Sequence, residues 1–297
     1  MQTVHYRGTS GLTIVADVEG PEDGPVVMLL HGGGQNRLAW KGSGSALAAQ
    51  GYRVVALDAR GHGDSEWDPD ADYEMEALAR DLLTVIDQIG AVRPAVVGAS
   101  LGGITALEAH AVTDYADIFS AVILVDIAPK VENNGSRRIV SFMTAHPNGF
   151  ATLDEAAAAI AAYNPHRPPP KSTSGLSKVL RQGEDGRWRW HWDPKFIAER
   201  AQHMLDDPEG WEALRQERAD RLHESAGAMR APLLLIRGLL SDLVSDETVA
   251  ALRAAAPRAE YVDVRGAGHM VAGDDNDAFT SAVLDFLERH HLRSSDS

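Results

Sequence analysis

One short segment constrains the fold of this chain more than any other. Residues 96–103 read Val-Val-Gly-Ala-Ser-Leu-Gly-Gly, so an apolar run ends in the pattern Gly-x-Ser-x-Gly and passes directly into a helical pattern. Glycines two residues before and after Ser100 remove Cβ atoms that would clash across a tight turn. The pattern therefore predicts a sharp strand-to-helix turn that holds Ser100 in strained backbone and exposes its hydroxyl.

Four more apolar runs end where reactive or flexible residues follow. They are residues 26–30 before His31-Gly32-Gly33-Gly34, 52–57 before Asp58, 232–236 before Arg237 to Asp242, and 261–264 before Gly266 to His269. The reacting groups of open parallel sheets collect beyond the carboxyl ends of the strands. Ser100, Asp242 and His269, in that chain order, are therefore expected at one edge of one sheet.

Strands and helices alternate along the first part of the chain. Residues 4–7 and 12–18 predict two short strands, and residues 121–127 predict a further buried one. Residues 74–89 predict the clearest helix, because their apolar side chains recur at three- and four-residue spacing. A helix over 101–111 follows Ser100. This alternation implies a mostly parallel sheet with helices on both faces.

The alternation stops after residue 129 and resumes at residue 232. Residues 130–229 contain helical patterns without a clear strand. We therefore expect a core of residues 1–129 and 230–297, with residues 130–229 inserted as a helical cap, or lid. A cap over the strand ends makes a site concave and dry.

A cluster of aromatic residues lies within the expected cap. It reads Trp188-Arg189-Trp190-His191-Trp192. One interpretation makes Trp188 and Trp190 substrate-binding residues that line the pocket. The competing interpretation places the tryptophans in the small core of the cap itself, where large rings contribute most to packing.

Taken together, these motifs resemble those of the α/β-hydrolase superfamily, from about residue 12 to residue 287. The resemblance implies an α/β-hydrolase fold: a mostly parallel eight-stranded sheet with helices on both faces and an inserted helical cap. It also implies a Ser-His-Asp catalytic triad of Ser100, His269 and Asp242. In the family, the oxyanion hole consists of the amide after the nucleophile, here Leu101, and a loop amide, here Gly33 with Gly34 as the alternative.

The chemistry of acyl transfer explains why these residue types occur together. A serine hydroxyl is a poor nucleophile until a base takes its proton, and imidazole titrates near neutral pH. A carboxylate orients the imidazole and stabilises its protonated form. Preorganised amides stabilise the tetrahedral oxyanion, by about 3–4 kcal/mol for a single donor.

Two of these assignments have competitors. Asp126 also follows a strand, and some relatives carry the acid there. His31 and His62 compete with His269, but they lie in loops where family members carry histidines that order the backbone. Only His269 follows the last strand, which favours it as the base.

The serine at the turn narrows the reaction. Relatives that open epoxides or cleave haloalkanes carry aspartate there. Serine favours hydrolysis of a carboxylic ester or lactone of a small, largely apolar substrate through an acyl-enzyme intermediate. Carbon–carbon bond hydrolysis, aminopeptidase-like amide hydrolysis and perhydrolysis are alternatives on the same triad. A ligand receptor that retains the triad is an alternative of another class, because a fold does not determine its use.

Composition excludes several other functions. The formal charge of −15 argues against nucleic-acid binding, which requires a basic surface. No apolar run approaches the ~18 residues of a membrane span, so no membrane partner is expected. The absence of cysteine and of an apolar signal segment favours a reducing cytoplasm. The histidines lack metal-ligand spacing, so neither a metal nor a cofactor is expected. The expected partner is the small-molecule ester or lactone.

Overall fold

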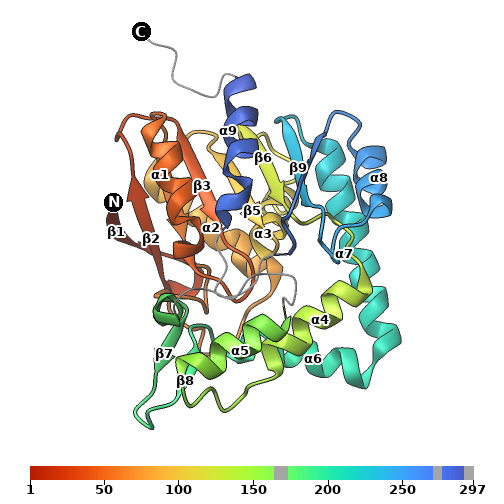
Figure 1. Cartoon of the computed structure of the whole chain (residues 1–297). Helices are drawn as coiled ribbons and strands as arrows, with labels where there is room; N and C mark the ends of the chain where they lie inside the picture. The colour runs from red at the N-terminus through yellow and green to blue at the C-terminus, as the bar shows by residue number, and fades with distance from the viewer. Residues whose placement is uncertain (164–172, 270–275, 291–297) are drawn as a thin grey trace.

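A single twisted sheet forms the centre of the computed structural model, which describes residues 1–163, 173–269 and 276–290 (Figure 1). Its strands are β1 (Gln2–Arg7), β2 (Thr13–Glu19), β3 (Val26–Leu30), β4 (Arg53–Leu57), β5 (Ala95–Ala99), β6 (Ala121–Val125), β9 (Leu233–Gly238) and β10 (Glu260–Val264). They lie in the order β1-β2-β4-β3-β5-β6-β9-β10. Strand β2 is antiparallel to both neighbours, and the other pairs are parallel. The predicted eight-stranded, mostly parallel sheet is confirmed.

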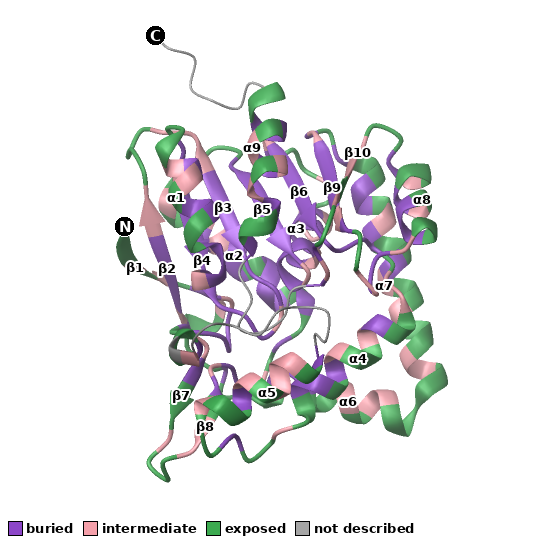
Figure 2. Ribbon diagram, viewed as in Figure 1, coloured by how far each residue is buried: buried purple, intermediate pink, exposed green. Residues whose placement is uncertain are grey.

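Helices cover both faces of this sheet. On one face the core includes side chains of α2 (Met75–Ile89), α3 (Leu101–Ala111), α7 (Pro208–Ala228) and α8 (Asp246–Ala255). On the other it includes side chains of α1 (Lys41–Ala49) and α9 (Thr280–Arg289). Every residue of β5 and β6 is buried, as Figure 2 shows, because both of their faces are covered.

The apolar stripe predicted for the α2 region is confirmed. Met75, Leu78, Leu82 and Val85 are all buried on one side of this helix. The helix ends at Gly90, whose φ of 70° is the left-handed conformation that glycine adopts without a Cβ penalty.

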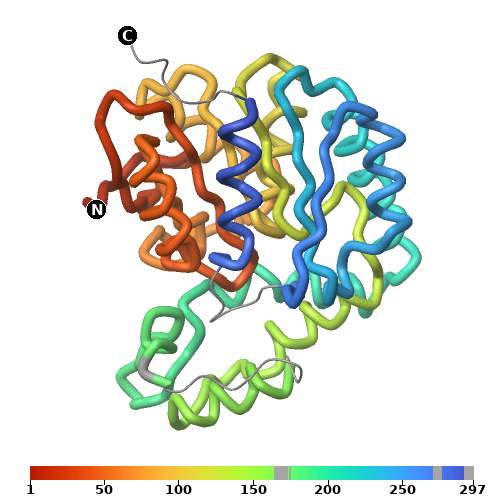
Figure 3. Tube along the Cα trace, turned by 45° about the horizontal axis from the view of Figure 1, so that its top comes forward, coloured from red at the N-terminus to blue at the C-terminus, as the bar shows by residue number. Residues whose placement is uncertain are grey.

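Residues between β6 and β9 form a layer beyond the carboxyl ends of the parallel strands (Figures 1 and 3). This layer holds α4 (Asn133–Thr144), α5 (Leu153–Tyr163), β7 (Leu180–Gln182), β8 (Trp188–Trp190) and α6 (Lys195–Asp206). The short hairpin of β7 and β8 differs from the expectation of a cap without strands. Helix α7 starts in this layer, but Leu222 and Ala226 near its end belong to the core of the sheet. The packing therefore places the second half of α7 with the core.

Four short 3₁₀ helices complete the described structure. They are η1 (Thr9–Gly11), η2 (Arg37–Trp40), η3 (Thr173–Lys178) and η4 (Asn276–Phe279). Among the described residues, no helix is both long enough and apolar enough to cross a bilayer.

Candidate active site

Ser100 occupies the sharp turn between β5 and α3, as the sequence predicts. Its φ of 45° and ψ of −109° lie in a region that residues with a Cβ rarely adopt. A Cβ on Gly98 would overlap the backbone of Gly102, and a Cβ on Gly102 would overlap the carbonyl of Leu30. The two glycines of the motif are therefore required by close approach of the backbone, and they allow the strained turn at Ser100.

The carboxylate that meets His269 belongs to Asp126, which directly follows β6. Nδ1 of His269 lies 2.8 Å from Oδ2 of Asp126, and both side chains are almost fully buried. A carboxylate oxygen accepts hydrogen bonds, so Nδ1 carries the hydrogen and Nε2 is left as the basic nitrogen. Asp126 is held in turn by the amide of Gly238 at 2.9 Å and the hydroxyl of Ser241 at 2.8 Å.

The expectation that Asp242 orients His269 is therefore wrong for this geometry. Asp242 instead accepts a hydrogen bond from Arg138 of α4 at 2.7 Å, and 35% of its side chain is exposed. After β9 the chain turns so that Ser241, not Asp242, points toward Asp126. The competing assignment raised from the sequence, Asp126, is the one that the geometry supports.

The loop after β3 approaches the start of α3. The amide of Gly102 donates to the carbonyl of His31 at 3.1 Å, which joins the two segments. The amide of Gly34 donates to Nε2 of His62 at 3.2 Å. Among the described residues, none accepts a hydrogen bond from the amide of Gly33 or of Leu101. These two amides are free to bind an oxyanion, whereas that of Gly34 is already used.

Two buried imidazoles hold this loop in place. His31 contacts the carbonyl of Gly32 through Nδ1 at 2.8 Å and accepts from the amide of Ala59 through Nε2 at 3.0 Å. His62 contacts the carbonyl of Arg60 through Nδ1 at 3.1 Å and accepts from Gly34 through Nε2. Each ring thus donates from Nδ1 and accepts at Nε2, which only the neutral form can do. Both are structural residues, as expected from their positions in the sequence.

Burial opposes protonation of both rings. It lowers the pKa of His62 to about 3, with the neighbouring His31 adding to the effect. Burial also lowers the pKa of His31. An unfolded chain takes up a proton on each imidazole near pH 6.5, whereas the folded chain resists until the pH is well below that value. The free energy of unfolding therefore decreases as the pH falls below about 6.5.

We expect the free energy of unfolding to fall with acidification between about pH 6 and pH 4, and the His62→Gln variant to show a shallower slope. Each histidine kept neutral contributes about 1.4 kcal/mol per pH unit in this range. Chemical denaturation at a series of pH values measures both slopes. Equal slopes in the two proteins would show that His62 is not held neutral.

One cavity of about 200 Å³ brings most of these groups together. Ser100, His269, Gly33 and Leu101 all line it. Its apolar wall comes from both the core and the layer above it, and it includes Met75, Ile104, Ile127, Pro129, Val131, Ile139, Val140, Met143, Phe196, Ile197 and Leu243. Asp242 is not among the described residues that line it.

Trp188 and Trp190 are also absent from the described lining of this cavity, which therefore gives no support to their assignment to substrate binding. Trp190 stacks on Trp192 with ring centroids 4.9 Å apart, and it packs edge-on against Phe150. Trp190 and Trp192 are buried in the core of the layer over the strand ends. This burial agrees with the competing interpretation for these two rings.

The aromatic residues that do line the cavity were missed in the sequence. They are Phe196 of α6 and Trp211 of α7. The available signal was the apolar pair Phe196 and Ile197 at the start of α6, both buried against the layer core. Nothing in their spacing distinguishes a residue that faces a pocket from one that packs in a core.

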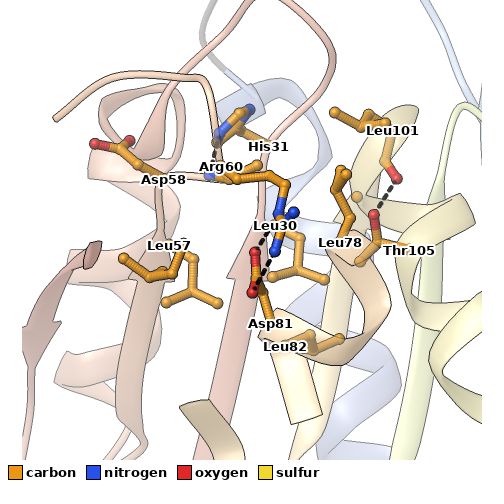
Figure 4. Close-up of a pocket in the computed structure, with 13 residues that line it drawn as sticks. Leu30, His31, Leu57, Asp58, Arg60, Leu78, Asp81, Leu82, Leu101 and Thr105 are labelled. Atoms are coloured by element: carbon orange, nitrogen blue, oxygen red, sulfur yellow. Dashed lines mark hydrogen bonds and ion pairs between the residues drawn. The ribbon is translucent and has the colours of Figure 1, made fainter. Parts of the chain in front are cut away.

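A second cavity, of about 30 Å³, lies beneath the loop that follows β3 (Figure 4). Arg60 reaches toward Asp81 there, with Nε 2.6 Å and Nη2 2.9 Å from its two carboxylate oxygens. The Thr105 hydroxyl donates to the carbonyl of Leu101 at 2.9 Å (Figure 4). This volume holds one or two water molecules and no larger ligand. The cavity lined by Ser100 and His269 is therefore the candidate substrate site.

Comparison with known proteins finds a family model, relatives in sequence and a similar solved structure. A family model described as the alpha/beta hydrolase fold matches residues 25–275. An esterase of Mycobacterium tuberculosis is 29% identical over 274 residues, which cover 89% of this chain and 83% of the relative. A 3-hydroxybutyrate-oligomer hydrolase of Cupriavidus necator is 28% identical over 257 residues, or 84% of each chain. The crystal structure of an alpha/beta hydrolase from Novosphingobium aromaticivorans aligns with a TM-score of 0.77 at 25% identity, covering 97% of this chain and 98% of that one.

Proposed function

The chain belongs to the α/β-hydrolase fold family, and from that premise we propose that it is a serine hydrolase of carboxylic esters or lactones. The observation that carries the proposal is the buried contact between His269 and Asp126, beside a cavity that Ser100 also lines. The substrate class is small and largely apolar, because most of the cavity wall is aliphatic or aromatic.

In the first half of the proposed reaction, Oγ of Ser100 attacks the carbonyl carbon of the ester while Nε2 of His269 takes its proton. The carbonyl oxygen becomes an oxyanion that accepts hydrogen bonds from the amides of Gly33 and Leu101. Asp126 stabilises the imidazolium through Nδ1. The oxyanion then collapses, and the leaving alkoxide takes the proton from Nε2.

In the second half, a water molecule replaces the alcohol. His269 takes a proton from the water, whose oxygen attacks the acyl carbon. Collapse of the second tetrahedral intermediate breaks the bond to Ser100, and Oγ recovers its proton from the imidazolium. The products are one carboxylic acid and one alcohol, or a single hydroxy acid from a lactone.

A substrate panel tests this proposal. Purified protein is assayed with 4-nitrophenyl esters of increasing acyl length, lactones and amino-acid arylamides. We expect multiple turnovers of esters or lactones. Preferential cleavage of the arylamides would favour an amidase instead. Stoichiometric binding without turnover of any ester would favour the ligand-receptor alternative.

A further inference from the structure

The wall of the catalytic cavity includes a group of cationic side chains. Lys130, Arg200, Arg215 and Arg218 line it, and Glu212 is the one carboxylate among the described lining residues. The chain as a whole carries a formal charge of −15, so this local excess of positive charge is opposite in sign to the net charge of the molecule. A wholly apolar substrate would not require these charges.

Among the described residues, Glu212 is the one carboxylate within ion-pair distance of these four cations. Glu212 is bound to Arg215 at 3.1 Å. Within the described residues, Lys130 donates to a neutral amide alone, Oε1 of Gln216 at 3.2 Å. Glu108 is attracted electrostatically by Arg218, but it forms its ion pair with Arg221 at 2.8 Å.

Among the described residues, Lys130, Arg200 and Arg218 form no ion pair with a carboxylate, and the two arginines carry the groups best shaped to bind an anion. Arg200 of α6 donates only to the carbonyl of Tyr73 at 2.8 Å, and its guanidinium lies 5.1 Å from the ring centroid of Phe196. Burial lowers the pKa of Arg200 to about 10; repulsion from Arg218 adds to this effect, and the weaker attraction of Glu74 opposes it. Because the charge of Arg218 repels the guanidinium of Arg200, an anion bound beside both groups would reduce that repulsion.

The position of these arginines suits the far end of a bound substrate. A neighbouring pocket of about 290 Å³ shares part of its wall with the catalytic cavity. The shared residues are Phe196, Arg200, Trp211, Arg215 and Arg218. The arginines therefore lie at the boundary between the catalytic cavity and the neighbouring pocket, and the shared aromatic rings provide an apolar surface beside them.

We propose that the substrate carries a free carboxylate, remote from the ester bond, that Arg200 and Arg218 bind. This inference rests on the proposed ester hydrolysis and specifies its substrate class: an ester with an apolar body and one anionic end. The planar fork of a guanidinium matches a carboxylate in geometry and charge. The apolar wall holds the body of the substrate, and Ser100 meets its carbonyl.

Matched pairs of esters test the proposal. One series consists of 4-nitrophenyl monoesters of dicarboxylic acids of increasing length, which place the carboxylate on the acyl side. A second consists of butyryl esters of hydroxy acids, which place it on the alcohol side. Each compound is paired with its neutral carboxamide analogue, and the ratio of kcat/KM within each pair is measured.

We expect the wild-type protein to prefer the carboxylate in at least one series by about tenfold or more, because hydrogen bonds between charged groups are stronger than those between neutral ones. Arg218→Gln is the primary variant, because Arg218 makes no hydrogen bond to another described residue. It and Arg200→Gln are each expected to lower the preference about tenfold. Arg253→Gln, which removes an exposed charge on α8 away from the cavity, is expected to keep the wild-type ratio.

The outcomes separate this inference from the proposed function. Equal kcat/KM for the carboxylate and carboxamide esters, or wild-type ratios in both arginine variants, would overturn the inference and leave ester hydrolysis standing. Failure of the wild-type protein to cleave any ester of either series would overturn both. A preference that Arg253→Gln also lowers would indicate a general effect of net charge and would likewise overturn the inference.

Discussion

The Ser100→Ala variant is expected to lose about a millionfold in kcat for ester hydrolysis, the scale seen when a triad serine is removed. Without Oγ no acyl-enzyme forms, and the strained turn presents only a methyl group to the cavity. Adding His269→Gln to Ser100→Ala is expected to lower the rate little further, because triad members act as a unit. Steady-state hydrolysis of one chromogenic ester measures all of these rates.

An exposed serine supplies the control for that experiment. Ser45 lies on α1, on the surface, and Ser45→Ala is expected to retain wild-type turnover. If Ser100→Ala keeps activity within tenfold of the wild-type rate, another nucleophile performs the reaction.

The Asp126→Asn variant is expected to lose about 10⁴-fold in kcat, whereas Asp242→Asn stays close to the wild-type rate. An amide in place of the carboxylate favours the wrong imidazole tautomer and leaves the imidazolium without its counter-charge. Asp242 instead makes a half-exposed ion pair with Arg138, of a kind that contributes about 1 kcal/mol or less. Steady-state rates of the two variants, purified in parallel, check the assignment. A large loss in Asp242→Asn with normal turnover in Asp126→Asn would restore the acid expected from the sequence.

The sequence predicted the parts of this site that depend on backbone geometry. Gly98 and Gly102 can be read from the motif because a Cβ at either position would overlap the backbone, whatever else the chain does. The buried strands can be read because β5 and β6 are apolar throughout. Such features depend on a few neighbouring residues, so local pattern is sufficient to find them.

The aspartate that pairs with His269 could not be identified from local sequence in the same way. Asp126 and Asp242 both follow parallel strands, and a loop has no period to tell which side chain points inward. The choice depends on contacts between distant segments, in particular the amide of Gly238 and the hydroxyl of Ser241 that hold Asp126 against His269. The packing of Trp190 could not be predicted for the same reason, because its partner Phe150 is far from it in the chain.

Chemical labelling tests the central claim most directly, because it requires no knowledge of the substrate. A 4-nitrophenyl phosphonate reacts with an activated serine, and mass spectrometry of peptides locates the label while release of nitrophenol gives the rate. The account predicts one phosphonyl group per chain, on Ser100, with labelling slowed strongly in Asp126→Asn and unchanged in Asp242→Asn. A label on another residue, or equal labelling rates in wild type and Asp126→Asn, would contradict it.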